Sequence, residues 1–142
     1  MELAVQFHFS AAHRLPRHPG RCHRMHGHSY KLQVLVEGSP DSDTGMVVDF
    51  YDIEESVGPV VRELNGTCLN DRLENPTAEA IVVWLWQQIR PELAVLSELR
   101  LWETDSCFVT YRGEPVAEKV TTPGAPGPHP STAPPGASPS DE

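Results

Sequence analysis

The sequence predicts an α+β fold in which an antiparallel sheet of four strands carries two helices on one face. Three observations support this class. Apolar residues alternate in two stretches near the N-terminus, recur at helical spacing in two stretches in the middle, and lie in two further short stretches before residue 113. The predicted order is strand, strand, helix, helix, strand, strand, and a helix pair set between runs of strands is typical of α+β domains.

The first two strands are predicted at residues 3–9 and 28–37. Every second residue of each stretch is apolar, which gives each strand one buried face. These residues are Leu3, Val5, Phe7 and Phe9 in the first stretch, and Tyr30, Leu32, Val34 and Val36 in the second. Residues 39–45, SPDSDTG, are rich in turn formers and are predicted to connect the second strand to the first helix.

The first helix is predicted from Asp49 to Leu64, because apolar residues recur there at intervals of three and four. They are Phe50, Ile53, Val57, Val61 and Leu64. Gly58-Pro59 is expected to interrupt this helix, since Pro59 lacks the N–H group that would bond to the preceding turn.

The second helix is predicted to start at Asn75-Pro76-Thr77, where a proline lies close to the first turn. Its apolar stripe is formed by Ala78, Ile81, Val82, Leu85 and Ile89. Pro91 is expected to end the helix. Trp84 and Trp86 lie off the centre of the stripe, so we expect them at an edge of the domain or at an interface.

The last two strands are predicted at residues 99–104 and 107–112, as a hairpin that turns at Asp105-Ser106. They complete a single domain over residues 1–120. Residues 121–142 contain seven of the fourteen prolines and no aliphatic residue larger than alanine. Such a segment buries too little apolar surface to offset its chain entropy, so it is predicted to be a disordered tail.

Composition argues against several classes of protein. The net charge of −9 argues against general nucleic-acid binding, which requires a broad basic face. The N-terminus lacks the basic start and long apolar run of a signal peptide, and no stretch is apolar enough for a membrane span. Three cysteines without a CxxC pair argue against a disulfide framework, so we expect a protein of the reducing cytoplasm.

One short stretch, CHRMHGHSY at residues 22–30, places a cysteine and three histidines within seven positions. His26 and His28 are two residues apart, so in a strand both imidazoles point to the same face. His13 follows the first strand and would lie near them if the two strands are antiparallel neighbours. Three histidines with one open position are typical of catalytic zinc. His8, His18 and His23 are interpreted as ordinary side chains.

The residue types alone leave the role of Cys22 undecided. As a fourth ligand it would close the site and make the metal structural. As a thiolate beside the metal, favoured by the nearby Arg21 and Arg24, it would be reactive. A surface run that binds no metal is the third alternative.

Basic residues gather around the same stretch. Residues 1–36 contain one acidic residue, Glu2, and five basic ones: Arg14, Arg17, Arg21, Arg24 and Lys31. They form either a solvated loop or a local field that attracts an anionic ligand to an otherwise acidic protein.

Six motifs in order resemble the 6-pyruvoyltetrahydropterin synthase and 6-carboxytetrahydropterin synthase family, with the bacterial branch more similar. They are FSAAHRLP, CHRMHGHSY, GMVVDF, CLND, ENPTAEAIVVWLW and WETDSCFVTYRGE, and they span residues 3–114. The resemblance implies the tunnelling fold: a four-stranded antiparallel sheet with two helices between its second and third strands. It also implies homohexamers of paired trimers, with active sites at subunit boundaries.

The resemblance also implies roles for individual residues. His13, His26 and His28 match the zinc ligands, and Cys22 matches the catalytic thiol. Glu103, also assigned to catalysis, matches the carboxylate that anchors the pterin, with Thr104 beside it in the substrate site. The expected substrate is 7,8-dihydroneopterin triphosphate, and the expected reaction is that of 6-carboxytetrahydropterin synthase, a lyase of queuosine biosynthesis.

The chain departs from the family pattern at Asn65-Gly66, which occupy the positions of an Asp-His pair. Neither residue can relay a proton, and Asn-Gly is instead a turn former. Trp102 stands where the bacterial branch tends to have lysine. His23, Asp71 and Cys68 are candidate replacement bases. The alternatives are a diverged enzyme that uses the same pocket on another substrate, and a non-catalytic pterin-binding relative.

Overall fold

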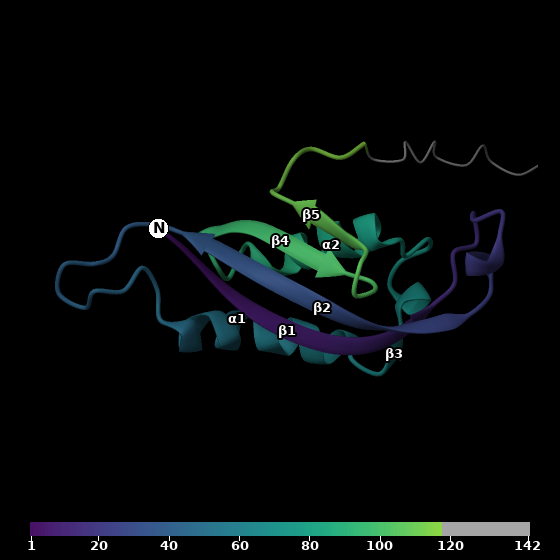
Figure 1. Ribbon diagram of the computed structural model, residues 1–142, viewed down its shortest axis with the longest axis horizontal. Helices are drawn as coiled ribbons and strands as arrows, with labels where there is room; N and C mark the ends of the chain where they lie inside the picture. Colours follow the sequence, from purple (N-terminus) through teal and green to yellow (C-terminus); the bar gives the residue numbers. More distant parts are fainter. Residues whose placement is uncertain (118–142) are drawn as a thin grey trace, which may run out of the picture.

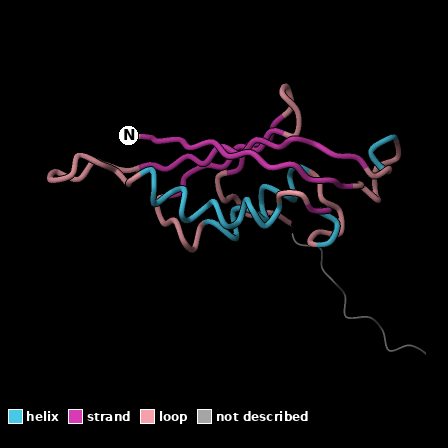
Figure 2. Tube along the Cα trace, turned by 90° about the horizontal axis from the view of Figure 1, so that it is seen from below, coloured by secondary structure: helices cyan, strands magenta, loops and turns pink. Residues whose placement is uncertain are grey.

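The computed structural model describes residues 1–117 and shows one sheet with two α-helices on one of its faces (Figures 1 and 2). The sheet has five strands, in the order β3 (Thr67–Cys68), β1 (Glu2–His13), β2 (His26–Glu37), β4 (Leu96–Trp102) and β5 (Phe108–Tyr111). Helix α1 (Phe50–Leu64) packs against β1, and helix α2 (Ala78–Ile89) packs against β4 and β5. The predicted α+β class is confirmed, and the predicted tail at 121–142 lies outside the described residues.

The long antiparallel pair of β1 (Glu2–His13) and β2 (His26–Glu37) forms the centre of the sheet. Both strands extend further than predicted, toward the loop that joins them. The additional pairs run from Ser10 opposite Ser29 to His13 opposite His26. Small residues weaken the apolar alternation in this region, so pairing with the partner strand determines where each strand ends.

The core lies between the sheet and the helices. Its fully buried side chains include Tyr30, Leu32, Val34, Ile53, Leu85, Ile89, Leu99 and Leu101. These residues come from β2, β4 and both helices, at the spacing that the sequence predicts. Burying one such aliphatic side chain stabilises the fold by about 1.5–3 kcal/mol.

Helix α1 (Phe50–Leu64) begins as predicted and runs through Pro59 without a break. The Asp49 side chain caps its start by accepting a hydrogen bond of 2.9 Å from the Tyr51 N–H. The predicted interruption at Gly58-Pro59 is wrong. Pro59 is exposed, so the carbonyl of Glu55 that loses its helical partner can bond to water.

Helix α2 (Ala78–Ile89) starts directly after the predicted motif and ends before Pro91. Thr77 caps it by accepting a 3.1 Å hydrogen bond from the Ala80 N–H. Trp84 and Trp86 are half-buried, and the Trp86 ring meets Tyr111 of β5 edge-on at 5.5 Å. The off-centre position expected for the two tryptophans is therefore confirmed.

The hairpin of β4 (Leu96–Trp102) and β5 (Phe108–Tyr111) is confirmed, with the turn at the expected residues. The fifth strand, β3 (Thr67–Cys68), is an addition to the four predicted strands. It pairs in parallel with Ala11–Ala12 of β1 and is followed by a short 3-10 turn, Leu69–Asp71. In the described part of the chain, neither helix combines the length and apolar character that crossing a membrane requires.

Candidate metal centre

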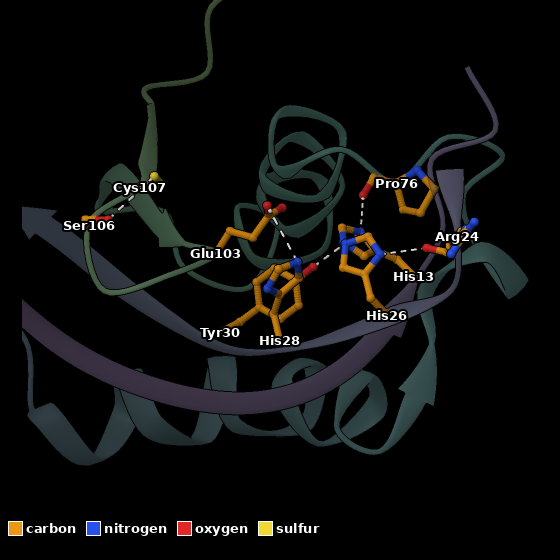
Figure 3. Close-up of polar contacts among 9 residues, drawn as sticks. All are labelled: His13, Arg24, His26, His28, Tyr30, Pro76, Glu103, Ser106 and Cys107. Carbon is orange, nitrogen blue, oxygen red and sulfur yellow. Dashed lines mark hydrogen bonds and ion pairs between the residues drawn. The ribbon is translucent and has the colours of Figure 1, made fainter. Parts of the chain in front are cut away.

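Three histidines meet where β1 ends and β2 begins (Figure 3). His13 and His26 are direct cross-strand partners, and His28 lies opposite Ala11 two pairs further along. One ligand atom from each ring lies within 4.8 Å of the others. Within residues 1–117, this is the one group of three or more metal-binding side chains at such distances.

Backbone carbonyls determine which nitrogen each of two rings presents to the cluster. His13 is wholly buried, and its Nδ1–H donates to the Pro76 carbonyl at 2.8 Å. The Nδ1–H of His26 donates to the Arg24 carbonyl at 2.7 Å. Because a carbonyl only accepts hydrogen bonds, both hydrogens must lie on Nδ1, and both Nε2 atoms are left for the cluster.

The two Nε2 atoms lie 3.0 Å apart. In neutral rings each of them carries a lone pair, so two acceptors face each other with no hydrogen between them. A cation between the rings would relieve this conflict. The arrangement of His13 and His26 therefore fits a bound metal ion.

His28 provides a second indication. Its Nε2 is buried and has no hydrogen-bond partner among the described residues, and the nearest carboxylate oxygen, Oε1 of Glu103, is 3.7 Å away. Burial lowers the pKa of this imidazole below its ordinary value; the Glu103 charge opposes that shift, and His13 and His26 add to it. The ring is therefore neutral near pH 7, which is the form that binds metals.

Tyr30 lies beside the cluster and is fully buried. Its hydroxyl is 3.4 Å from His13 Nδ1, and its ring stacks on Phe9 at 4.9 Å. Burial, with a smaller contribution from Glu103, raises the pKa of the hydroxyl, so it stays protonated. The sequence identified Tyr30 only as a core residue, because its alternation with Leu32 and Val34 says nothing about its hydroxyl group.

Glu103 follows β4, and its backbone N–H donates to the Cys107 carbonyl at 3.0 Å. Its carboxylate points toward His28 (Figure 3) and lines a cavity of about 250 Å³. Other lining residues include Leu15, Thr77 and Cys107. The cavity therefore adjoins the histidine cluster through Glu103.

Thr104 lies elsewhere. It lines a separate cavity of about 370 Å³ together with Lys31 and Trp102. Both residues lie in the bend between β4 and β5, and they line different cavities. The structure does not bring Thr104 to the cavity that Glu103 lines.

Cys22 lies in a short 3-10 turn, Arg21–His23, within the loop that joins β1 and β2. It is half-buried, and its thiol is not part of the histidine cluster. The Cys22 carbonyl accepts a 2.9 Å hydrogen bond from Leu15 N–H, which closes the loop. This arrangement does not support Cys22 as a fourth ligand that closes the site.

Asn65-Gly66 form a turn, as the sequence suggested. Gly66 has a φ of +75°, in the left-handed region that favours glycine. The Asn65 side chain accepts from Ser10 N–H at 2.9 Å, and Gly66 N–H donates to the Ser10 carbonyl at 2.7 Å. The pair therefore attaches β3 to β1 and offers no group that exchanges a proton.

The candidate replacement bases lie outside the histidine cluster. His23 and Asp71 are exposed, and Cys68 is half-buried with its thiol 3.8 Å from Asn70 Oδ1. Among the basic residues near the cluster, Arg17 forms a 2.7 Å ion pair with Glu74.

The fold and the site together define the class: a tunnelling-fold protein with a histidine cluster able to hold a metal. A model of the 6-pyruvoyl tetrahydropterin synthase family matches residues 2–114. The chain belongs to this family.

Individual relatives agree with this assignment. The chain is 42% identical over 91 residues to the 6-carboxy-5,6,7,8-tetrahydropterin synthase of Synechocystis sp., covering 59% of this chain and 70% of that protein. It is 40% identical over 82 residues to the dihydroneopterin monophosphate aldolase of Pyrococcus furiosus, covering 56% and 70%. The structure of 6-pyruvoyl tetrahydropterin synthase from Caenorhabditis elegans has a TM-score of 0.75 at 24% identity, covering 80% and 96%, and shows the shared fold.

Proposed function

We propose that this protein is a zinc-dependent lyase of the 6-carboxytetrahydropterin synthase type that acts on 7,8-dihydroneopterin triphosphate or a related pterin. The observation that carries the proposal is the meeting of three imidazoles, two of them with facing Nε2 atoms, beside a cavity lined by a carboxylate. Family membership and the name of the Synechocystis relative support the reaction type.

Each part of the site has a chemical task in this proposal. His13, His26 and His28 would hold the zinc ion, which supplies a Lewis acid for the hydroxyl groups of the substrate side chain. Glu103 would anchor the ring, because the aminopyrimidinone edge offers two adjacent N–H donors and a carboxylate accepts both. Cys22 would move a proton in its thiolate form.

The turn at Asn65-Gly66 limits this reaction. A positioned general acid or base typically contributes about 10²–10⁴-fold to the rate, so we expect slow turnover unless another group replaces the pair. His23, Asp71 and Cys68 remain the candidates. Substitution of each in turn, with the rate measured at saturating substrate, identifies the one that acts.

The test of the main proposal is direct. Zinc-loaded protein is incubated with 7,8-dihydroneopterin triphosphate, and mass spectrometry detects 6-carboxytetrahydropterin and acetaldehyde. Cys22→Ala should keep its zinc and lose activity, whereas loss of zinc would favour a closed site. Tight pterin binding without turnover would contradict the proposed enzymatic activity and indicate a non-catalytic pterin-binding protein.

A second candidate function is retro-aldol cleavage of a dihydroneopterin side chain. Such a cleavage removes one proton from a side-chain hydroxyl, breaks the carbon–carbon bond to release an aldehyde, and returns one proton to the carbon left on the ring. The synthase must in addition eliminate triphosphate and rearrange hydrogens on the side chain, so the lack of a proton-relaying pair at Asn65-Gly66 favours the simpler cleavage. The Pyrococcus furiosus relative is named as an aldolase. The product distinguishes the two reactions, since cleavage leaves a 6-hydroxymethyl group on the ring instead of a carboxylate.

We also propose a cytoplasmic homohexamer with sites at subunit boundaries, active in queuosine or other 7-deazapurine synthesis. The free edge of β1 supports self-association, since no strand in residues 1–117 pairs with that edge between Glu2 and Ser10. Size-exclusion chromatography with light scattering measures the oligomer. The neighbouring genes in the genome test the pathway, since genes for other steps of queuosine or 7-deazapurine synthesis would support it.

A further inference from the structure

The His28 imidazole and the Glu103 carboxylate face each other at the candidate metal centre without forming a hydrogen bond. The Nε2 of His28 is buried and has no hydrogen-bond partner within the described residues. The Glu103 Oε1 is 3.7 Å from it, which is too long for a hydrogen bond. Leaving a buried ring nitrogen unpaired costs about 1–3 kcal/mol, so the contact needs an explanation.

The backbone places the Glu103 carboxylate at this point. Strand β4 pairs with β2, and Trp102 lies opposite Lys31, so the chain reaches residue 103 beside the start of β2. The hydrogen bond from Glu103 N–H to the Cys107 carbonyl then fixes the residue at the start of the turn. The side chain keeps partial exposure, 28%, toward the cavity. One carboxylate therefore borders both the histidine cluster and the cavity.

The negative charge of Glu103 matters at this position beside the histidine cluster. Three neutral imidazoles carry no charge that opposes a divalent cation, whereas one carboxylate beside them offsets half of it. Histidines that bind metals usually donate the N–H of their other ring nitrogen to a carboxylate or a carbonyl, which orients the ring. His13 and His26 have carbonyl partners in Pro76 and Arg24. Glu103 differs from these carbonyls, because it faces the unpartnered Nε2 of His28, the nitrogen left for the metal, and therefore acts on a bound cation through its charge.

We propose that Glu103 is a partner of the metal centre as well as a lining residue of the cavity, positioned against His28 so that it stabilises the bound cation. This role rests on the proposed function in taking the three histidines as metal ligands. It adds a second task to a residue otherwise assigned to the ring of the substrate. Metal affinity is then tied to the same carboxylate that faces the cavity.

The experiment measures zinc affinity without substrate, by competition with a chromogenic chelator. Glu103→Gln keeps the size of the side chain and removes its charge, and we expect zinc to bind at least about tenfold more weakly. Glu79→Gln is the matched control: Glu79 lines the same cavity, is exposed, and makes no contact with the three histidines. Its zinc affinity should equal that of the unchanged protein.

Two results would overturn the inference: unchanged zinc affinity in Glu103→Gln, or an equal loss in both variants, which would indicate the overall charge of the cavity. Circular dichroism checks that both variants fold. Glu103→Asp adds a second measurement, because it retains the charge and should bind zinc more tightly than Glu103→Gln. The visible spectrum of the Co²⁺-loaded protein should also change in Glu103→Gln and stay the same in Glu79→Gln.

These measurements separate this inference from the proposed function. A protein that turns over no dihydroneopterin triphosphate, yet loses zinc affinity in Glu103→Gln, contradicts the proposed function alone. A protein that makes the carboxy product, yet binds zinc equally well in both variants, contradicts the role of Glu103 at the metal centre alone.

Discussion

His13 is the most constrained side chain of the histidine cluster, since it is wholly buried and hydrogen-bonded to Pro76. Replacing it by alanine removes one of the three proposed metal ligands and leaves a small cavity. We expect zinc content after dialysis to fall from about one ion per chain to a small fraction of that. His8→Ala, an exposed change in the same strand, should keep its zinc. Full zinc content in His13→Ala, measured by inductively coupled plasma mass spectrometry, would contradict the assignment.

Cys107 gives a prediction about pH. Hydrogen bonds from Thr104 and, to a lesser extent, Ser106 lower the pKa of this exposed thiol. A lowered pKa means that the reactive thiolate persists to lower pH, so alkylation of Cys107 should remain fast at pH values where an ordinary thiol reacts slowly. Thr104→Val should shift this profile back toward higher pH, and Ser106→Ala should shift it less. Mass spectrometry of iodoacetamide-treated protein follows each cysteine separately.

The meeting of the three histidines could be predicted, whereas the groups that orient their rings could not. The spacing of His26 and His28, and the place of His13 at a strand end, are visible in the residue pattern. The partners of His13 and His26 are backbone carbonyls of Pro76 and Arg24, and every residue has such a carbonyl. No sequence signal distinguishes them, so these contacts depend on the folded chain.

At the scale of an element, the turn at Asn65-Gly66 is the clearest test of backbone geometry. A Cβ at Gly66 would meet no atom within 4 Å, so any cost of Gly66→Ala comes from its φ of +75°. We expect the free energy of unfolding to fall by about 1–2 kcal/mol, the usual cost of a left-handed non-glycine residue. Urea unfolding of the metal-free protein measures it.

The control for this change lies in β2. A Cβ at Gly27 would meet the Ala11 carbonyl oxygen at 3.7 Å, an ordinary contact, and its φ is not positive. Gly27→Ala should therefore leave stability nearly unchanged. Equal losses in both variants would refute the conformational argument. The same strain should weaken any Gly66→His variant designed to restore the missing histidine.

Helices and strands were predicted correctly where apolar residues recur with a strong period, and were missed where pairing with a neighbouring strand determines the structure. Strand β3 has two residues, too few for any alternation, and it exists because the turn at Asn65-Gly66 holds it beside β1. The interruption predicted at Pro59 was wrong because the sequence does not show that this residue faces solvent. Both cases depend on surroundings that a local pattern does not contain.

At the scale of the whole molecule, charge is distributed unevenly. The chain carries −9, yet exposed arginines surround the loop beside the histidine cluster. Arg17 is paired with Glu74, whereas the Arg21 side chain forms no ion pair within residues 1–117. On the proposed function, Arg21 is therefore the better placed of the two to attract the triphosphate of a substrate. Arg17→Glu should have a smaller effect than Arg21→Glu.

We expect Arg21→Glu to raise KM several-fold at low salt with kcat nearly unchanged, because the field acts on encounter and not on the reacting atoms. Screening lengths fall from about 10 Å at 0.1 M salt to about 3 Å at 1 M, so the difference from the unchanged protein should shrink as salt is added. Arg90→Glu makes the same change of charge at the far end of α2, about 18 Å along the helix, and should leave KM nearly unaltered. An unchanged KM for Arg21→Glu at low salt would contradict the steering role. An equal rise in Arg90→Glu would assign the effect to net charge, since only a local field makes the position of the arginine matter.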